Sequence, residues 1–244
     1  HTRFRNVTGV QTCALPIYES LSRLDAGVGM ILDDLAATGR ADDTLVIFLS
    51  DNGRPFPGAK TNLYDPGLHL PLIVRAPGAA AAVNDAMVSW TDVAPTVLDW
   101  TGVAPPSAYP LSGSSLLPIL GKTTDPIRTA VFASHDFHEI NQYYPMRSVR
   151  TRRHSYILNL AWQLPYPIAG DVAGSPSWKA IAADPTIRLG RRTQAAYLQR
   201  PAEELYDLAR DPEEVTNLAA DPAYPGIKAE LAERLRRDRK STRL

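Results

Sequence analysis

Cysteine is almost absent from this sequence, because Cys13 is the only one among 244 residues. A single cysteine excludes an internal disulfide and cannot by itself build a thiolate metal site. An excess of charge is also lacking, since lysine plus arginine and aspartate plus glutamate both total 26. A neutral chain has no field that would steer it onto nucleic acid or an anionic membrane. We therefore expect no nucleic-acid partner.

Long apolar runs are missing as well. No stretch approaches the roughly 20 apolar residues of a membrane-spanning helix, so we expect no membrane span. Residues 1–5 are not followed by the apolar region of a signal peptide. Hydrophobic residues make up 44% of the chain and charged residues 21%, as in an ordinary globular protein. The length suits one large α/β domain, alone or with a smaller one, and carries no indication of oligomeric state.

The two ends of the chain differ in style from the rest. Residues 5–17 (RNVTGVQTCALPI) and 239–244 (RKSTRL) resemble translated sequencing-adapter sequence. Neither segment has helical or strand periodicity, and the helical pattern begins at Tyr18. We therefore predict that residues 1–17 and 239–244 are not native, and we give no weight to the glycosylation-like triplet that begins at Asn6.

Helices alternate with apolar strands in the first half of the chain. Residues 19–38 have apolar side chains at helical spacing, and Gly39 follows as a C-cap. Residues 44–50 (TLVIFLS) and 70–76 predict strands buried on both faces, as in a parallel sheet. Residues 88–102 predict a helix with Thr91 as its N-cap. This alternation is typical of an α/β fold.

The second half of the chain predicts strands without alternating helices. The strand segments are 129–134, 146–160 and 204–208, which indicate an antiparallel sheet, and residues 225–239 predict an amphipathic helix. The segment between them, 162–185, is rich in proline and predicts loops. We therefore predict a boundary near residue 125, between an α/β domain (18–125) and a small α+β subdomain (126–238).

Polar side chains follow the first buried strand. Asp51 and Asn52 lie at its carboxyl end, where ligand sites of open α/β sheets gather. Their oxygen atoms suit Ca²⁺ or Mg²⁺. The alternative is a hairpin turn at Asn52-Gly53, although the proline-rich continuation supplies no ladder. Lys60 in the same loop suits a sulfate or phosphate oxygen, or it is an ordinary surface charge.

Several blocks in order carry a family resemblance. Residues 45–78 (LVIFLSDNGRPFPGAKTNLYDPGLHLPLIVRAPG), flanked by 22–44, 88–98, 113–120 and 204–222, resemble the sulfatases of the alkaline phosphatase superfamily. The resemblance implies the C-terminal part of an alkaline phosphatase-like sandwich, a mostly parallel sheet with helices. A small α+β subdomain with an antiparallel sheet would follow it.

The resemblance also implies roles for the polar residues. Asp51 and Asn52 would be ligands of the catalytic cation, usually Ca²⁺, and Lys60 would contact the sulfate. The nucleophile, a formylglycine made from the cysteine of a C-x-P-x-R motif, would lie on N-terminal sequence outside this chain. Cys13 does not fit that motif, because Pro16 lies three residues after it and the arginine is absent. We therefore expect the chain alone to be inactive, and we expect the intact protein to be exported.

A narrower resemblance concerns the substrate. Residues 135–150 and 159–168 are similar to sulfamidases, which act on N-sulfated glucosamine, although sulfamidases tend to carry arginine at the position of Lys60. The resemblance implies a sulfated carbohydrate substrate and a sugar pocket lined by His135, His138 and Glu139. A structural role for each histidine stays open, as does an O-sulfated sugar.

Two other functions stay open. The first is a phosphonate or phosphodiester hydrolase of the same superfamily, which would share the fold and the Asp51-Asn52 pair. The second is a carbohydrate-binding relative without catalytic activity. The upstream sequence would distinguish them, because it carries the nucleophile and the remaining metal ligands.

Overall fold

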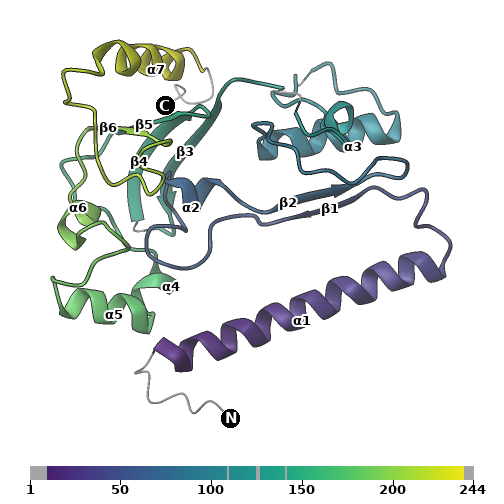
Figure 1. The fold of residues 1–244 in the computed structure, drawn as a ribbon, viewed down its shortest axis with the longest axis horizontal. Helices are drawn as coiled ribbons and strands as arrows, with labels where there is room; N and C mark the ends of the chain where they lie inside the picture. The colour runs from purple at the N-terminus through teal and green to yellow at the C-terminus, as the bar shows by residue number, and fades with distance from the viewer. Residues whose placement is uncertain (1–9, 109, 125–126, 141, 239–244) are drawn as a thin grey trace. The chain divides into compact units, whose positions relative to one another are not determined.

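The computed structural model describes residues 10–108, 110–124, 127–140 and 142–238, with the backbone alone for 10–17. The chain divides into two compact units, one of residues His1–Val46 with Val74–Ala79 and one of Ile47–Ile73 with Ala80–Leu244. No described helix is long and apolar enough to cross a membrane. The α-helices and strands, labelled in Figure 1, are α1 (Val10–Ala37), β1 (Val46–Leu49), α2 (Asp65–Leu68), β2 (Leu72–Arg75), α3 (Val93–Thr101), β3 (Val131–His138), β4 (Gln142–Arg150), β5 (His154–Asn159), α4 (Gly170–Ala173), α5 (Pro176–Ala183), α6 (Gln194–Leu198), β6 (Glu203–Asp207) and α7 (Pro225–Arg237). The 3₁₀ helices η1 (Trp90–Asp92) and η2 (Leu117–Ile119) lie between β2 and β3 in the sequence.

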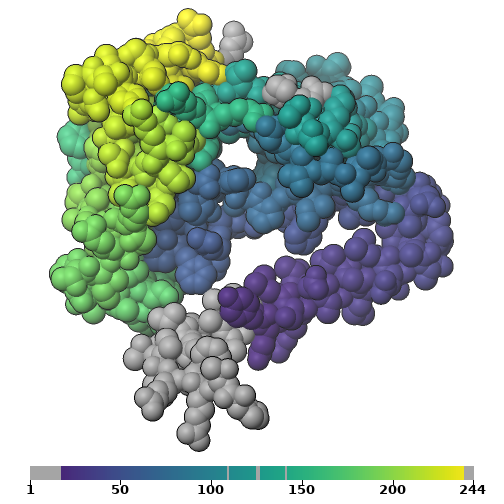
Figure 2. All heavy atoms as spheres, viewed as in Figure 1, coloured from purple at the N-terminus to yellow at the C-terminus, as the bar shows by residue number. Residues whose placement is uncertain are grey.

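Helix α1 is longer than its apolar pattern predicts. The pattern begins at Tyr18, whereas the helix begins at Val10 and includes residues expected to lack helical structure. Adding a turn to an existing helix costs less than nucleating one, so a weak segment next to a strong one becomes helical. The apolar residues Leu21, Leu24 and Ile31 of α1, purple in Figure 2, are exposed to solvent.

Strands β1 and β2 pair in a two-stranded sheet, at the two predicted places. The prediction that both are buried on two faces is wrong, because Phe48 is 36% exposed and Ile73 is 63% exposed. An apolar run becomes buried on both faces only where helices or further strands cover them.

The segment before β3 is ordered by one buried carboxylate. Ser89, and not the predicted Thr91, caps η1, and the Ser89 backbone N–H donates to Asp92 at 2.8 Å. Asp92 also accepts two hydrogen bonds from the Arg128 guanidinium, at 2.6 and 2.5 Å. Helix α3 continues from η1 and ends at Gly102, whose φ of 69° suits a left-handed C-cap.

The predicted antiparallel sheet is confirmed. Its four strands pair in the order β3-β4-β5-β6, all antiparallel, and the pairing of β3 with β4 is irregular between His135 and Phe137. One hydrophobic cluster contains Leu231 and Leu235 of α7, packed with residues of β4, β5 and β6. The second contains residues of the sheet with others from the loop before α2 and from 161–197, namely Leu63, Tyr64, Tyr144, Met146, Ile157, Ala161, Tyr166, Tyr197 and Tyr206. The segment 162–185, predicted to be rich in loops, also contains two short helices, α4 and α5. Helix α5 begins with Pro176 after the Ser175 cap, a position where proline favours a helix.

Candidate functional site

The loop between β1 and α2, residues 50–64, carries the first candidate residues. The Arg54 carbonyl accepts the backbone N–H groups of Phe56 at 2.7 Å and Lys60 at 3.1 Å, so the loop turns back on itself. A Cβ added to Gly53 would lie 2.8 Å from the Pro66 carbonyl, which only glycine avoids. Lys60 is therefore held by backbone close to the segment that follows β1.

The Lys60 ammonium donates to the Asp171 carboxylate at 2.6 Å. The Lys60 side chain is 21% exposed and that of Asp171 is 44% exposed, so the pair lies at the surface. The other Asp171 oxygen accepts the Val172 backbone N–H at 2.9 Å. The hydrogen bond from Lys60 is the main cause that lowers the pKa of Asp171, and His138 lowers it further. No sequence pattern pointed to Asp171, because it lies far along the chain from Lys60 in a segment expected to be rich in loops.

The turn of the β3–β4 hairpin lies next to the segment that contains Asp171, the partner of Lys60. Glu139, at a φ of 56°, accepts from Gln142 Nε2 at 3.0 Å, and its carboxylate lies 3.8 Å from His138 Nε2. A Cβ on Gly170 would lie 2.9 Å from Glu139 Oε2, so this carboxylate abuts the residue before Asp171. The structure therefore brings the predicted residues His138 and Glu139 to Asp171, the partner of Lys60.

His135 has a different environment. Its ring is half buried, and Nδ1 lies 3.1 Å from the Tyr144 carbonyl, to which it donates. Burial lowers the pKa of His135, so the neutral ring is favoured. The Nε2 atom is buried and has no hydrogen-bond partner among the described residues. Among the described residues, no hydrogen bond or ion pair joins His135 to Lys60 or Asp171. The role of His135 as a pocket residue therefore stays a prediction.

Asp51 and Asn52 are exposed directly after β1. Their carboxylate and carboxamide oxygens are ligands of the kind that Ca²⁺ and Mg²⁺ take. Among the described residues no group of three or more His, Cys, Asp and Glu side chains could hold a metal ion. The pair would supply two of the six to eight oxygen ligands that Ca²⁺ typically takes, roughly a quarter to a third, so its metal role stays a prediction that needs ligands from other residues.

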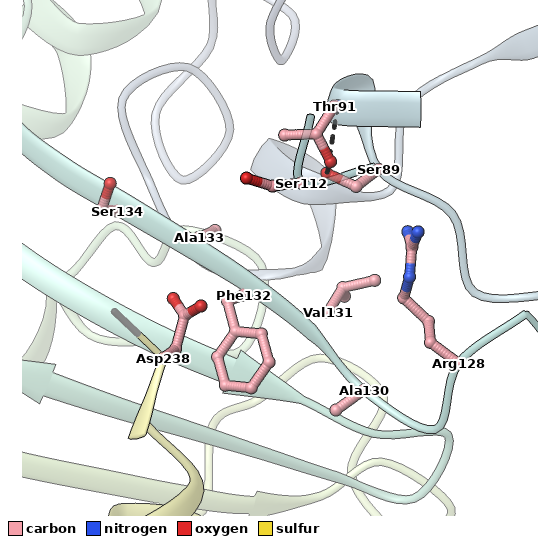
Figure 3. Close-up of a pocket in the computed structure, with 10 residues that line it drawn as sticks. All are labelled: Ser89, Thr91, Ser112, Arg128, Ala130, Val131, Phe132, Ala133, Ser134 and Asp238. Atoms are coloured by element: carbon pink, nitrogen blue, oxygen red, sulfur yellow. Dashed lines mark hydrogen bonds between the residues drawn. The ribbon is translucent and has the colours of Figure 1, made fainter. Parts of the chain in front are cut away.

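A separate pocket of about 430 Å³ lies along β3, shown in Figure 3. None of the candidate site residues lines it. Its only arginine, Arg128, is paired with buried Asp92 in two hydrogen bonds, so its charge is neutralised and is not offered to an anion. The lining residues are Ser89, Thr91, Ser112, Arg128, Ala130, Val131, Phe132, Ala133, Ser134 and Asp238.

Comparisons with known sequences give consistent matches. Residues 16–103 match the family model described as Sulfatase. Human N-sulphoglucosamine sulphohydrolase is 41% identical over 234 residues, which are 90% of this chain and 45% of that protein. An ulvan-active sulfatase of Formosa agariphila is 29% identical over 91% of this chain and 37% of that protein. The chain thus spans about half the length of the curated relatives it matches, or less.

Solved structures share the fold. A protein in complex with its substrate D-glucosamine-2-N,6-O-disulfate superposes with a TM-score of 0.65 at 23% identity, over 91% of this chain and 39% of that one. The phosphonate monoester hydrolase of Agrobacterium radiobacter superposes with a TM-score of 0.59 at 26% identity, over 88% and 38%. The predicted sulfatase-like α/β fold is confirmed by these neighbours. Residues 16–103 thus match a sulfatase family model, and the chain is similar to sulfatases along about nine-tenths of its length.

Proposed function

We propose that this chain belongs to a hydrolase that removes the sulfate group of a sulfated sugar, with N-sulfoglucosamine as its first substrate. One observation carries the proposal: the structure gathers Lys60, Asp171, His138 and Glu139 from three separate segments at one surface site. The human relative whose printed name states N-sulphoglucosamine hydrolysis supports the choice of sugar.

Lys60 would bind the sulfate group. An ammonium has three donors, so Lys60 can keep its bond to Asp171 and still donate to a sulfate oxygen. Such a preorganised donor offsets negative charge that develops on the non-bridging oxygens as the sulfur is attacked. The carboxylates of Asp171 and Glu139 repel an anion but accept hydrogen bonds from sugar hydroxyls. They would therefore face the sugar, with His138 beside them.

Asp51 and Asn52 would hold a divalent cation, Ca²⁺ or Mg²⁺, together with ligands from other residues. When bound, the cation polarises sulfate oxygens. The formylglycine expected from the family resemblance is assigned to no residue of this chain. The activity test therefore uses the complete open reading frame that contains these residues.

The test of the function is a substrate panel of N-sulfoglucosamine, an O-sulfated glucosamine and a phosphonate monoester. We expect hydrolysis of N-sulfoglucosamine with the highest kcat/KM. The phosphonate is included because a phosphonate monoester hydrolase shares the fold. Preference for the phosphonate would replace the proposal with that activity, and sugar binding without turnover would indicate a carbohydrate-binding protein.

Substitution of Lys60 tests its role in the site. We expect Lys60→Ala to lower kcat about 100- to 1000-fold, because loss of one such donor has that typical effect. Lys60→Arg keeps the positive charge and should retain most activity, since an arginine also binds sulfate oxygens. Lys179→Ala, at an exposed lysine of α5, is the control. Wild-type rates in Lys60→Ala would remove Lys60 from the site.

The location of the protein is a further part of the proposal. The family resemblance implies export, to the periplasm or outside the cell in a bacterial host. Fractionation of cells that express the complete open reading frame would test this, and activity confined to the cytoplasm would contradict it.

A further inference from the structure

The backbone on both sides of Lys60 is held by side chains from a distant segment, residues 166–200. Tyr197 of α6 provides the first contact, because its phenol oxygen accepts the Gly58 N–H at 3.1 Å and Asn62 Nδ2 at 3.2 Å. Asn62 Nδ2 also donates to the Lys60 carbonyl at 3.0 Å. One buried phenol therefore links the residues before and after Lys60.

Tyr166 holds the next peptide. Its hydroxyl donates to the Thr61 carbonyl at 2.8 Å and lies 2.7 Å from Thr61 Oγ1. Thr61 has a φ of 65°, in the left-handed region that a β-branched residue rarely adopts. Burial raises the pKa of Tyr166 to about 12, so the phenol remains a neutral donor. The turn at Thr61 thus depends on a contact made by a residue far away in sequence.

Arg200 joins these contacts into one group. Its Nη2 donates to Asn62 Oδ1 at 2.6 Å, and its Nε donates to the Tyr197 carbonyl at 3.1 Å. The guanidinium carbon lies 3.5 Å from the centre of the Tyr166 ring, in a cation–π contact. Arg200 is 3% exposed, so its charge is compensated by these partners rather than by water.

We propose that Tyr197, Tyr166 and Arg200 are positioning residues, which fix the backbone of residues 58–62 and thereby hold the Lys60 ammonium where a sulfate group binds. The inference rests on the proposed role of Lys60. A lysine side chain is flexible, and Lys60 contacts Asp171 at the surface. The position of the Lys60 ammonium therefore depends on the backbone from which its side chain extends.

The test compares two tyrosine variants of the complete enzyme. Tyr197→Phe removes the phenol oxygen that binds Gly58 and Asn62 but keeps the ring. Tyr206→Phe is the matched control, because the two tyrosines are 2% and 3% exposed in the same hydrophobic cluster. The Tyr206 hydroxyl donates to Glu204, which keeps its bond from Tyr64 at 2.8 Å.

Three quantities are measured in each variant: kcat/KM for N-sulfoglucosamine, the inhibition constant of inorganic sulfate, and amide hydrogen exchange of residues 58–62. In Tyr197→Phe we expect the inhibition constant of sulfate to rise about threefold to tenfold, the range that corresponds to loss of one hydrogen bond between Lys60 and the anion. We expect kcat/KM to fall at least as much and exchange at Gly58 to become faster. Tyr206→Phe should change none of the three by more than about twofold.

Equal effects in the two variants, or unchanged sulfate inhibition in Tyr197→Phe, would overturn the inference. If Tyr197→Phe does not fold, Tyr166→Phe, which removes the contact with Thr61, is compared with the same control and the same limits. The exchange measurement needs no substrate. If the wild-type enzyme neither hydrolyses N-sulfoglucosamine nor binds sulfate, the proposed function fails, while unchanged exchange at residues 58–62 in Tyr197→Phe rejects the positioning role separately.

Discussion

Lys60 illustrates how a single residue is interpreted from sequence and then from structure. Its place in the loop after β1 indicates an anion contact, and the structure adds a carboxylate partner, Asp171, at 2.6 Å. An anion that binds Lys60 must do so next to that negative charge. The affinity of the site for sulfate is therefore a balance between the two side chains.

Removal of the Asp171 charge should tighten sulfate binding. In Asp171→Asn we expect the inhibition constant of inorganic sulfate to fall by about threefold to tenfold, because one like charge near the anion is lost and solvent screens the rest. Asp184→Asn is the control, since Asp184 is exposed and its carboxylate accepts hydrogen bonds from Thr186, two residues further along the chain. Weaker inhibition in Asp171→Asn would show that this carboxylate holds Lys60 in place instead.

His135 should make stability depend on pH. Burial lowers its pKa in the folded state below the ordinary value of 6.5. Below that pH the unfolded chain binds a proton that the folded chain resists, so the free energy of unfolding decreases as pH falls through 6.5. His154, whose pKa is also lowered by burial, acts in the same direction.

Urea unfolding at several pH values between about 7.5 and 5 measures this effect in the range where histidine titrates. We expect His135→Gln to reduce the loss of stability across that range. An unchanged slope in His135→Gln would contradict the buried, neutral state of His135.

At the scale of elements, strands and helices were predicted better than the loops between them. Sequence patterns located β1, β2, β6 and α7, whereas the single strand segment predicted at 146–160 covers parts of two strands, β4 and β5. The loop that carries Lys60 has no such pattern. Its course depends on close backbone packing against α2, as at Gly67, where an added Cβ would meet the carbonyl oxygens of Asn62 and Ala59.

Two glycine substitutions should therefore have opposite effects. We expect Gly67→Ala to destabilise the protein by about 1–3 kcal/mol, because the added methyl meets backbone that cannot move freely. Gly27→Ala in α1, where a Cβ would meet nothing within 4 Å, should stabilise the helix by about 0.5–1 kcal/mol. Thermal unfolding of both variants measures the two shifts. A Tm in Gly67→Ala as high as that in Gly27→Ala would show that the backbone around residue 67 accepts the added methyl group without cost.

At the scale of the whole molecule, the proposed cation couples the site to stability. A ligand that binds only the folded protein raises the free energy of unfolding in proportion to the logarithm of its concentration over Kd. Asp51 and Asn52 are exposed after β1, and their conformation would be fixed by a bound cation.

Calcium should therefore raise the Tm of the complete protein, by an amount that corresponds to about 2.7 kcal/mol at 100 times Kd. Chelation should reverse the shift and lower activity. In Asp51→Ala the shift should be much smaller, whereas Asp42→Ala, at an exposed carboxylate before β1, should respond as the wild type does. An equal calcium shift in Asp51→Ala would place the cation elsewhere.

The sequence by itself determined the alternation of helix and strand in the first half of the chain, the antiparallel sheet and the C-terminal helix, and it identified Lys60, His138 and Glu139 as candidates, because local patterns and family motifs carry that information. The short helices α2, α4, α5 and α6 were not predicted. The boundary near residue 125 and the metal role of Asp51 and Asn52 stay predictions. Tertiary structure alone decided that Asp171 pairs with Lys60, that Tyr197 and Arg200 hold its loop, and that Ile73 is exposed. These contacts join residues far apart in the chain, so they follow from packing, which no local pattern records.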